Sequence, residues 1–228
     1  MRFSHTRWPL SSIGYRCHMS TSATAYAFAK QAILDGRFPG GELISEGDVA
    51  RELGLSRTPV REAFLRLEAE GLLRLYPKRG ALVVPVSPAE VTHVMETRLL
   101  VESFAIERAA RTRPGLGLTL SEVIDAQEAH IAAGDPAAFV DADREFHRVL
   151  VEAAGNPILL QLYDSLRDRQ ARMGLAALAR SEERLRTIVD EHRAIASAVA
   201  DGRADDAVQS LTEHLERQLR LLREVPVG

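Results

Sequence analysis

Residues 45–84 constrain the fold more than any other part of this chain, because they predict a complete winged helix-turn-helix. A first helix is expected to begin after Ser45, and Gly54 supplies the positive φ that a tight turn needs. A second helix is expected at once, with Thr58 capping its free N–H groups and Pro59 at the first helical position. The apolar residues expected to form the buried side are Val49, Ala50, Leu53, Leu55, Val60, Phe64, Leu67 and Leu72.

A two-stranded wing is expected after the second helix. The apolar runs 73–75 and 81–84 flank residues 76–80, Tyr-Pro-Lys-Arg-Gly, so this segment predicts a hairpin with a basic tip. A helix with outward cations beside a basic wing fits the grooves of DNA. The same pattern also fits a small α/β segment whose arginines are only solvated. The arginines expected to face outward from the second helix are Arg57, Arg61 and Arg66.

The composition favours a mainly helical protein with two small domains. The 228 residues are 46% hydrophobic and only 5% aromatic, which is lean for a β-rich protein but sufficient for a core in each half. The formal net charge is −3, so any affinity for DNA has to come from the local placement of cations. Residues 45–84 contain seven Arg and Lys against six Asp and Glu.

The N-terminal segment and the cysteine content indicate a cytoplasmic protein. Cys17 is the single cysteine, which excludes an intrachain disulfide and fits a reducing compartment. No apolar run reaches the length of a membrane span, and the first residues lack the features of a signal peptide. We expect a disordered tail over 1–22, with Met1 and Met19 both open as the start of translation. A helix from Ala25 to Asp35 is expected to begin the DNA-binding domain, 23–86.

An antiparallel bundle of six helices is expected beyond Val86, over residues 87–223, with a short tail at 224–228. Helix stops recur in this part without strand-like alternation. Ser87 and Pro88 form a capping residue and a first helical position, which marks where the bundle begins. The expected helices span 88–112, 120–133, 136–154, 157–180, 182–201 and 204–223.

A divalent metal site is a candidate function of the bundle. Asp143 and His147 are four residues apart and share one helix face, while His192 and His214 lie on the last two expected helices. One carboxylate and three imidazoles suit zinc best, and also nickel, manganese or iron. Octahedral geometry would leave positions for water or an incoming carboxylate. The alternative is a surface Asp–His pair and histidines that are only packed or solvated.

The N-terminal half resembles the DNA-binding domain of the GntR family of bacterial transcription regulators. The resemblance rests on LGLSRTPVREA at residues 53–63, followed by Leu67, Gly71 and Leu72. It implies that Arg57 and Arg61 read bases, since arginine can grip guanine through two hydrogen bonds. The further DNA contacts that it implies are Ser56 and Thr58 on phosphate, and Lys78, Arg79 and Gly80 in the wing.

One position departs from the family pattern. Many relatives place a DNA-contacting arginine where this chain has Gly47, and glycine has no side chain to make that contact. We therefore expect a different operator preference, with Arg51 as a candidate substitute.

The C-terminal half resembles the FCD effector-binding domain, in its shorter six-helix form, that one GntR subfamily carries. The matching runs are DREFH at 143–147, GNP at 155–157, EHRAI at 191–195 and EHL at 213–215. In metal-containing members the matching residues hold the ion, here Asp143, His147, His192 and His214. The resemblance covers about residues 23 to 223.

The family resemblance implies a ligand-controlled homodimer that binds an inverted-repeat operator, commonly as a repressor released by its effector. The implied effector is a small organic or sugar acid whose carboxylate completes the metal coordination. Arg98 matches a family arginine that faces the effector, and Asn156 is a second candidate. Two alternatives stay open: Arg98 could pair only with Glu102, and Asn156 could only cap the next helix.

An enzyme is the main alternative class, as a helical metal-dependent hydrolase fused to a DNA-binding module. None of the seven histidines is followed by Asp, and the HExxH and GxSxG motifs are absent. Glu145 is the only general base that the sequence offers near the metal residues. We therefore expect no catalytic activity. A regulator whose metal is purely structural remains a third possibility.

Overall fold

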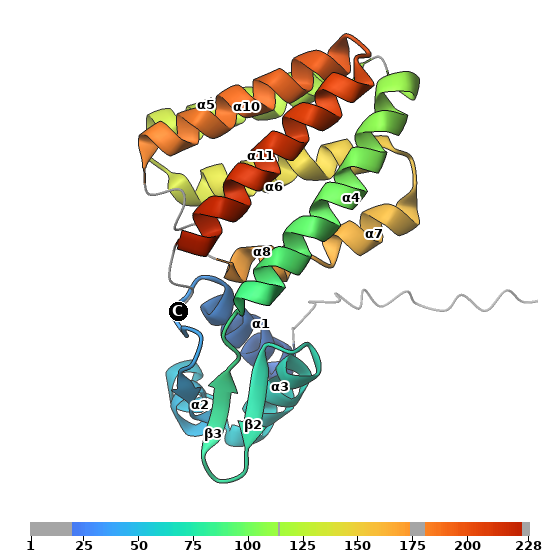
Figure 1. The fold of residues 1–228 in the computed structure, drawn as a ribbon. Coiled ribbons are helices and arrows are strands. Elements are labelled where there is room, and N and C mark those ends of the chain that lie inside the picture. Colours follow the sequence, from blue (N-terminus) through green and yellow to red (C-terminus); the bar gives the residue numbers. More distant parts are fainter. Residues whose placement is uncertain (1–19, 114, 174–180, 225–228) are drawn as a thin grey trace, which may run out of the picture.

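The computed structural model describes residues 20–113, 115–173 and 181–224. Figure 1 shows two parts, a small winged domain and a larger bundle of helices joined through one connection and a shared contact surface. Within the described residues, no helix is both long and apolar enough to cross a membrane. The expected fold class, a winged helix-turn-helix followed by an all-α antiparallel bundle, is confirmed.

Helix α1 (Thr21–Leu34) begins earlier than the sequence predicts. Ser20 is its N-cap, because the Ser20 Oγ accepts a hydrogen bond from the Ala23 N–H at 3.1 Å. The expected start at Ala25 is therefore wrong, and the last two residues of the expected tail, 21–22, are helical. The rest of the tail prediction concerns residues 1–19, which lie outside the described part of the chain.

Helix α2 (Glu46–Leu53) has the predicted beginning and end. The Ser45 Oγ accepts from the Gly47 N–H at 3.1 Å, which caps the helix. Gly54 ends it in the left-handed region at φ 64°, where glycine has no Cβ to clash. The turn into the next helix is therefore encoded locally.

Helix α3 (Arg57–Ala69) starts two residues earlier than expected. Ser56 is the extended N-cap, so Thr58 lies inside the first turn and is not the cap. Pro59 is tolerated in this turn because the first N–H groups of a helix have no helical acceptor. Six of the eight residues expected on the buried side are buried, and Leu53 and Leu55 are half-buried. The six buried residues are Val49, Ala50, Val60, Phe64, Leu67 and Leu72.

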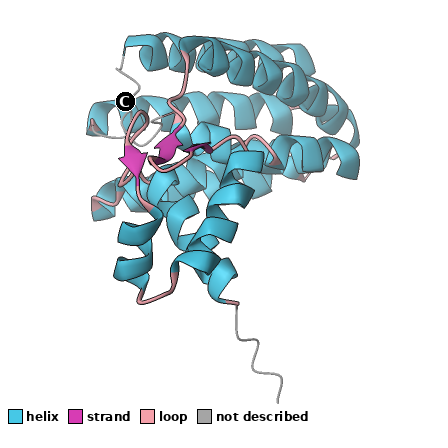
Figure 2. Ribbon diagram, turned by 90° about the horizontal axis from the view of Figure 1, so that it is seen from below, coloured by secondary structure: helices cyan, strands magenta, loops and turns pink. Residues whose placement is uncertain are grey.

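The wing is part of a three-stranded sheet rather than a two-stranded hairpin. β3 (Gly80–Val83) pairs antiparallel with both β2 (Leu73–Tyr76) and a short strand that the sequence analysis missed, β1 (Leu43–Ile44). Gly80 has φ 104°, and a Cβ there would lie 2.5 Å from the Ile44 carbonyl oxygen. This glycine is therefore required for the close approach of β1. Figure 2 shows that strands form only a small part of the molecule.

The bundle is built from five long helices and two short ones among the described residues. α5 packs against α6 and α10, α11 packs against α4 and α10, and α4 also contacts α6. One continuous apolar cluster fills the space between them. The long helices are α4 (Pro88–Thr112), α5 (Leu116–Ala133), α6 (Pro136–Ala153), α10 (Glu182–Ala200) and α11 (Ala204–Glu224).

The single helix expected over 157–180 is wrong. The structure has α7 (Pro157–Asp164) and α8 (Arg167–Arg172), and residues 174–180 lie outside the described part. The chain turns after α7, so that Tyr163 and Leu166 can pack into a separate apolar cluster with α4 and α6. This tertiary packing outweighs the helical pattern of the segment.

Helix α8 lies at the junction of the two parts, next to α1 (Figure 1). Lys30 of α1 lies 2.6 Å from the Asp168 carboxylate of α8 and 3.1 Å from Glu70, just beyond the end of α3. Arg172 of α8 donates to the Val84 carbonyl in the connection between the parts. The bundle therefore contacts the winged domain at α1 and also holds the connection at Val84.

Candidate DNA-binding surface and buried metal centre

The exposed side of α3 carries the side chains expected to contact DNA. Ser56, Arg57, Thr58 and Arg61 are all exposed, and the Ser56 side chain makes no capping hydrogen bond. Their hydrogen-bonding groups therefore face solvent at the start of the helix. Arg66 is also exposed, as expected, and its guanidinium stacks on the Tyr26 ring, with the guanidinium carbon 3.7 Å from the centroid.

The space beside Gly47 is occupied by the side chain of Arg57. A Cβ built on Gly47 would lie 3.3 Å from Arg57 Nη2 and 3.5 Å from its Nε. The missing side chain thus lets the Arg57 guanidinium lie against the first turn of α2. Arg51, the candidate substitute, is exposed and pairs with Asp48 at 3.1 Å.

The wing tip presents Lys78 and Arg79 to solvent. Both side chains are exposed, and Lys78 adopts the left-handed backbone region at φ 63°, which is unusual for a residue with a side chain. Gly80 is the first residue of β3, and the close approach of β1 leaves no room for a side chain at this position.

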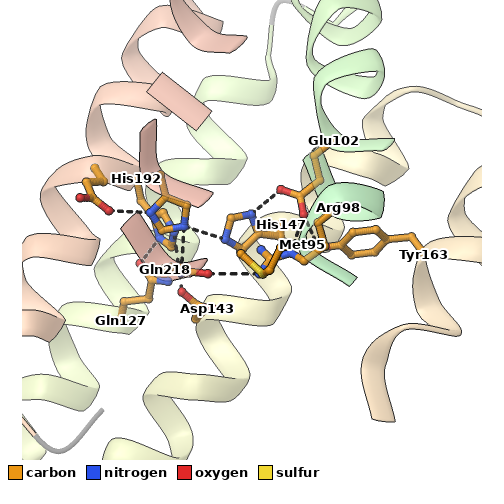
Figure 3. A network of polar contacts seen from close by, with 11 residues as sticks. Met95, Arg98, Glu102, Gln127, Asp143, His147, Tyr163, His192 and Gln218 are labelled. Carbon is orange, nitrogen blue, oxygen red and sulfur yellow. Dashed lines mark hydrogen bonds and ion pairs between the residues drawn. The ribbon is translucent and has the colours of Figure 1, made fainter. Parts of the chain in front are cut away.

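Three imidazoles from three helices converge inside the bundle (Figure 3). His147 lies on α6, His192 on α10 and His214 on α11, and one nitrogen of each lies within 4.8 Å of the others. All three are buried, and so is Asp143, one turn before His147. The surface Asp–His pair considered from sequence is therefore ruled out.

Each imidazole is held by an acceptor at its Nδ1 atom. Glu102 Oε2 lies 2.7 Å from His147 Nδ1, Gln127 Oε1 lies 3.0 Å from His192 Nδ1, and Glu191 Oε2 lies 2.6 Å from His214 Nδ1. Such acceptors place the proton on Nδ1 and leave the Nε2 lone pair free, as is common around metal-bound histidines.

The ring of His192 is also fixed by stacking. The Phe146 ring lies against it with centroids 3.9 Å apart and an angle of 8° between the planes. The Phe146 side chain is on the same helix as His147. One helix therefore supplies a candidate ligand and orients a second one.

The Nε2 atoms point at one another and at a carboxylate. His147 Nε2 lies 3.3 Å from His214 Nε2, and His192 Nε2 lies 3.7 Å from Asp143 Oδ1. Among the described residues, His192 Nε2 and Asp143 Oδ1 are buried without a hydrogen-bond partner. Lone pairs and an anionic oxygen directed at one point fit a divalent cation, and nitrogen with oxygen donors suits zinc. The donor set therefore fits the ion expected from sequence.

Burial keeps the cluster unprotonated. Desolvation lowers the pKa of His192 well below its usual range, lowers that of His147, and lowers that of His214 to about 4. Burial, the largest single effect, would raise the pKa of Glu102, but the charge of Arg98 together with the contacts of His147 and Arg98 outweighs it, and the pKa falls to about 2. The imidazoles are thus neutral, as metal ligands must be, beside an ionised glutamate.

Arg98 is fully buried beside this cluster. Its Nε donates to Glu102 Oε1 at 2.9 Å, and its Nη1 donates to Gln218 Oε1 at 3.2 Å. The Gln218 Nε2 in turn lies 3.0 Å from His214 Nε2. Tyr163 O–H donates to Glu102 Oε1 at 2.8 Å. Arg98 therefore pairs with Glu102, as one of the two interpretations from sequence expected, and Glu102 in turn contacts the candidate ligand His147.

Two other expected site residues lie apart from this network. Asn156 is the N-cap of α7, where its Oδ1 accepts from the N–H groups of Ile158 and Leu159 at 3.1 and 3.2 Å. Glu145, the candidate base, is half-exposed and pairs with Arg148 at 3.6 Å, on the outer side of α6. The Glu145 carboxylate therefore lies outside the buried histidine cluster.

The sequence analysis missed most of the surrounding shell. Gln218 follows His214 at helical spacing, and Glu191 directly precedes His192, so local patterns could have suggested them. No local signal marks Gln127 or Tyr163, because their contacts join helices that are far apart in the chain. Glu102 was considered only as a partner of Arg98.

The winged helix-turn-helix and the helical bundle that follows it together define a DNA-binding regulator of transcription. Two family models match in that order: "Bacterial regulatory proteins, gntR family" over residues 21–83 and "FCD domain" over residues 93–217. The chain therefore belongs to the GntR family and carries an FCD effector-binding domain, as the sequence analysis predicted. Regulators of this family are not enzymes, so the hydrolase alternative is excluded.

Two relatives that are named as transcriptional repressors match most of the chain. A probable D-xylose utilization operon transcriptional repressor of Paenarthrobacter nicotinovorans is 31% identical over 84% of each chain. The gluconate operon transcriptional repressor of Bacillus licheniformis is 26% identical over 86% of this chain and 83% of its own.

Solved structures share the fold at lower identity. A GntR regulator of Rhodococcus sp. RHA1 matches with a TM-score of 0.74 and 24% identity, covering 91% of this chain and 99% of its own. Escherichia coli McbR/YncC matches with a TM-score of 0.71 and 22% identity, over 90% and 98%. These likenesses support the arrangement of the two parts.

Proposed function

We propose that this protein is a cytoplasmic repressor that binds an inverted-repeat operator as a homodimer and is released by a small organic or sugar acid. The observation that carries the proposal is the convergence of three histidine Nε2 atoms beside Arg98, inside the domain that binds effectors in this family. Two relatives named for sugar-related operons support a sugar acid as the effector class.

The metal in this proposal is held by Asp143, His147, His192 and His214. Zinc is the metal that best suits the donors, with nickel, manganese and iron as alternatives. A bound ion would supply a positive centre that can accept an effector carboxylate. Glu102, Gln127 and Glu191 would orient the imidazoles through their Nδ1 atoms.

The effector carboxylate is proposed to contact Arg98. This guanidinium is buried, permanently charged, and already held in place by Glu102 and Gln218. Desolvated arginine binds a carboxylate more strongly than an exposed one does, because water no longer competes. Asn156 remains a weaker candidate, since its side-chain oxygen is used in capping α7.

On DNA, Arg57 and Arg61 are proposed to read bases in the major groove. Ser56 and Thr58 would anchor the helix start to phosphate, and Arg51 would substitute for the DNA-contacting arginine that is missing at Gly47. The wing would add contacts from Lys78, Arg79 and the Gly80 backbone. This assignment rests on family resemblance and on the exposure of these side chains.

The homodimer is proposed to form through an exposed apolar face on α4 and α7. Leu100 is 74% exposed and Ile158 is 78% exposed, with Phe104 and Leu162 exposed beside them on the same two helices. Several large apolar side chains exposed on neighbouring helices are typical of a protein interface. Two copies joined there would carry two recognition helices, as an inverted repeat requires.

Effector binding is proposed to reach DNA through α7 and α8. Tyr163 of α7 binds Glu102, which holds the candidate ligand His147. α8 follows α7 and contacts Lys30 of the winged domain through Asp168. An effector that favours one position of α8 would therefore favour one arrangement of the two winged domains, with a coupling of about 1–3 kcal/mol.

The test compares metal, effector and operator binding in one protein. We expect the purified chain to hold one divalent ion per protomer and a saturating acid from a panel of sugar acids to raise its melting temperature only when the metal is present. Stabilisation should reach about 2.7 kcal/mol at a ligand concentration about 100 times Kd. The same acid should weaken operator binding.

Matched variants separate the possible outcomes. His192→Ala should abolish metal content and the response to acid, while His93→Ala, an exposed histidine of α4, should preserve both. An ion that is present without any response to acid would indicate a purely structural metal. Absence of the ion after growth in supplemented medium would refute the proposed centre.

A further inference from the structure

Gln218 of α11 lies between the histidine cluster and Arg98 (Figure 3). Its side chain is buried, and its two polar atoms have different partners. The Oε1 accepts from Arg98 Nη1 at 3.2 Å, and the Nε2 lies 3.0 Å from His214 Nε2. The amide therefore joins α4 to one of the candidate metal ligands.

The direction of the contact between Gln218 and His214 follows from the neighbours at both ends. Arg98 has only N–H donors, so the Gln218 oxygen faces Arg98 and the NH2 group faces the histidine. Glu191 Oε2 lies 2.6 Å from His214 Nδ1, so the imidazole proton is on Nδ1 and the Nε2 atom is an acceptor. Gln218 Nε2 therefore donates to the Nε2 lone pair of His214.

This lone pair is also the one that a metal ion needs. An imidazole nitrogen has one lone pair, which can bind either a hydrogen-bond donor or an ion. Among the described residues, the Nε2 atom of His192 has no hydrogen-bond partner, and that of His147 faces only His214. His214 is thus the candidate ligand at which an N–H donor and an ion require the same electrons.

We propose that Gln218 competes with the metal ion for His214, so that an ion which binds there displaces the Gln218 amide. This competition rests on the metal centre of the proposed function and gives that centre a residue that both weakens and responds to the ion. The released N–H is buried and requires another acceptor. An oxygen atom bound to the ion, from water or from a carboxylate, can take that hydrogen bond.

Displacement of Gln218 would change the contacts of Arg98. The Gln218 oxygen holds Arg98 Nη1, and Arg98 Nε donates to Glu102 at 2.9 Å. Glu102 in turn accepts from Tyr163 of α7. The occupancy of His214 would therefore reach α7 through this chain of hydrogen bonds.

The first test measures the affinity of the full chain for Zn²⁺ by competition with a chromophoric chelator. Gln218→Met removes the donor and nearly keeps the side-chain volume. It should bind Zn²⁺ about twofold to tenfold more tightly, because the ion no longer has to break a hydrogen bond. Gln209→Met, at an exposed glutamine of the same helix, is the matched control and should leave the affinity unchanged.

The sign of the change distinguishes competition from support. A contact that only orients His214 for the ion would make Gln218→Met bind Zn²⁺ more weakly, and a contact without influence would leave the affinity equal. Either of these results overturns the proposed competition.

Gln218→Glu shows whether the gain comes from a disturbed Arg98. Glutamate keeps an oxygen acceptor for Arg98, but when ionised it cannot donate to His214. This variant should therefore also bind Zn²⁺ more tightly than the natural chain does, and its negative charge adds to the gain. A loss of affinity, with the fold intact by circular dichroism, would contradict the competition.

NMR separates the competition from the metal centre itself. The nitrogen–nitrogen scalar coupling across the hydrogen bond between Gln218 Nε2 and His214 Nε2 should be present after treatment with a chelator and absent when Zn²⁺ is bound. Mg²⁺, which prefers oxygen ligands, should leave the coupling unchanged. Binding of Zn²⁺ with the coupling retained would overturn the competition alone, whereas a chain that binds no Zn²⁺ would refute the metal centre as well.

Discussion

The Nε2 atoms of His147 and His214 lie 3.3 Å apart, while the Nδ1 atom of each ring faces a glutamate. The orientation of Gln218 agrees with this protonation state, because its Oε1 accepts from Arg98 and its Nε2 is therefore free to donate to His214 Nε2. Two neutral lone pairs that face each other in a dry interior repel. A cation between the rings relieves this repulsion, and so does a proton.

The metal-free protein should lose stability as the pH falls below about 6.5. The folded-state pKa values of His147, His192 and His214 are lowered by burial, that of His214 to about 4, so the unfolded chain takes up protons first. Above the pKa of the unfolded histidines, the free energy of unfolding does not depend on their protonation. Below it, each histidine should lower the free energy of unfolding by up to about 1.4 kcal/mol per pH unit, until the pH reaches the pKa of that histidine in the folded protein. Urea denaturation of chelator-treated protein at several pH values measures this slope.

His192→Leu is the matched variant for this pH dependence, because it removes one of the buried groups. It should reduce the slope by about one proton, whereas the exposed His93→Ala should leave it unchanged. A free energy of unfolding that stays constant from neutral pH down to about pH 5 would contradict the lowered histidine pKa values.

Arg57→Ala and Arg61→Ala should each weaken operator binding by about 1–3 kcal/mol and relax base preference at one position. The physical reason is the loss of two hydrogen bonds to one base edge. Fluorescence anisotropy with an operator and its single-base variants measures both effects. Arg186→Ala on α10 is the control, since this exposed arginine lies in the bundle. Full specificity in either α3 variant would argue against the proposed docking.

Gly47→Ala should separate stability from DNA recognition. Alanine favours a helix over glycine by about 0.5–1 kcal/mol, and the new Cβ would lie 3.3 Å from the flexible end of Arg57 and 3.4 Å from the Ser45 Oγ. We therefore expect a higher melting temperature together with altered operator affinity, because Arg57 has to move. Thermal denaturation and operator titration together test this. Unchanged operator binding would show that the position of Arg57 over α2 does not matter for recognition.

If the proposed homodimer forms through α4 and α7, Leu100→Glu and Ile158→Glu should convert it into monomers with weak operator binding. Each places a charge on the apolar face of α4 and α7, where partner burial would remove its hydration. Leu118→Glu is the control, because this leucine is 76% exposed on α5. Light scattering coupled to size-exclusion chromatography gives the mass. A dimer that persists in both variants would place the interface elsewhere.

Local sequence determined the winged domain almost completely. Gly54 ends α2 at a positive φ, and apolar residues at helical spacing fill the core, because turns and periodicity are local properties. The same reasoning placed the start of α3 two residues late, since Ser56 and Thr58 are both competent caps and only the packed chain selects one. β1 was missed because two residues carry no periodicity.

In the bundle, the sequence by itself determined that Asp143 and His147 share one helix face, through their spacing alone. The tertiary structure decided that His192 and His214 meet them, that Gln127 and Tyr163 complete the network, and that the segment after Pro157 breaks into α7 and α8. Spacing along one helix is fixed by its geometry, whereas contacts between helices depend on how their apolar faces pack together.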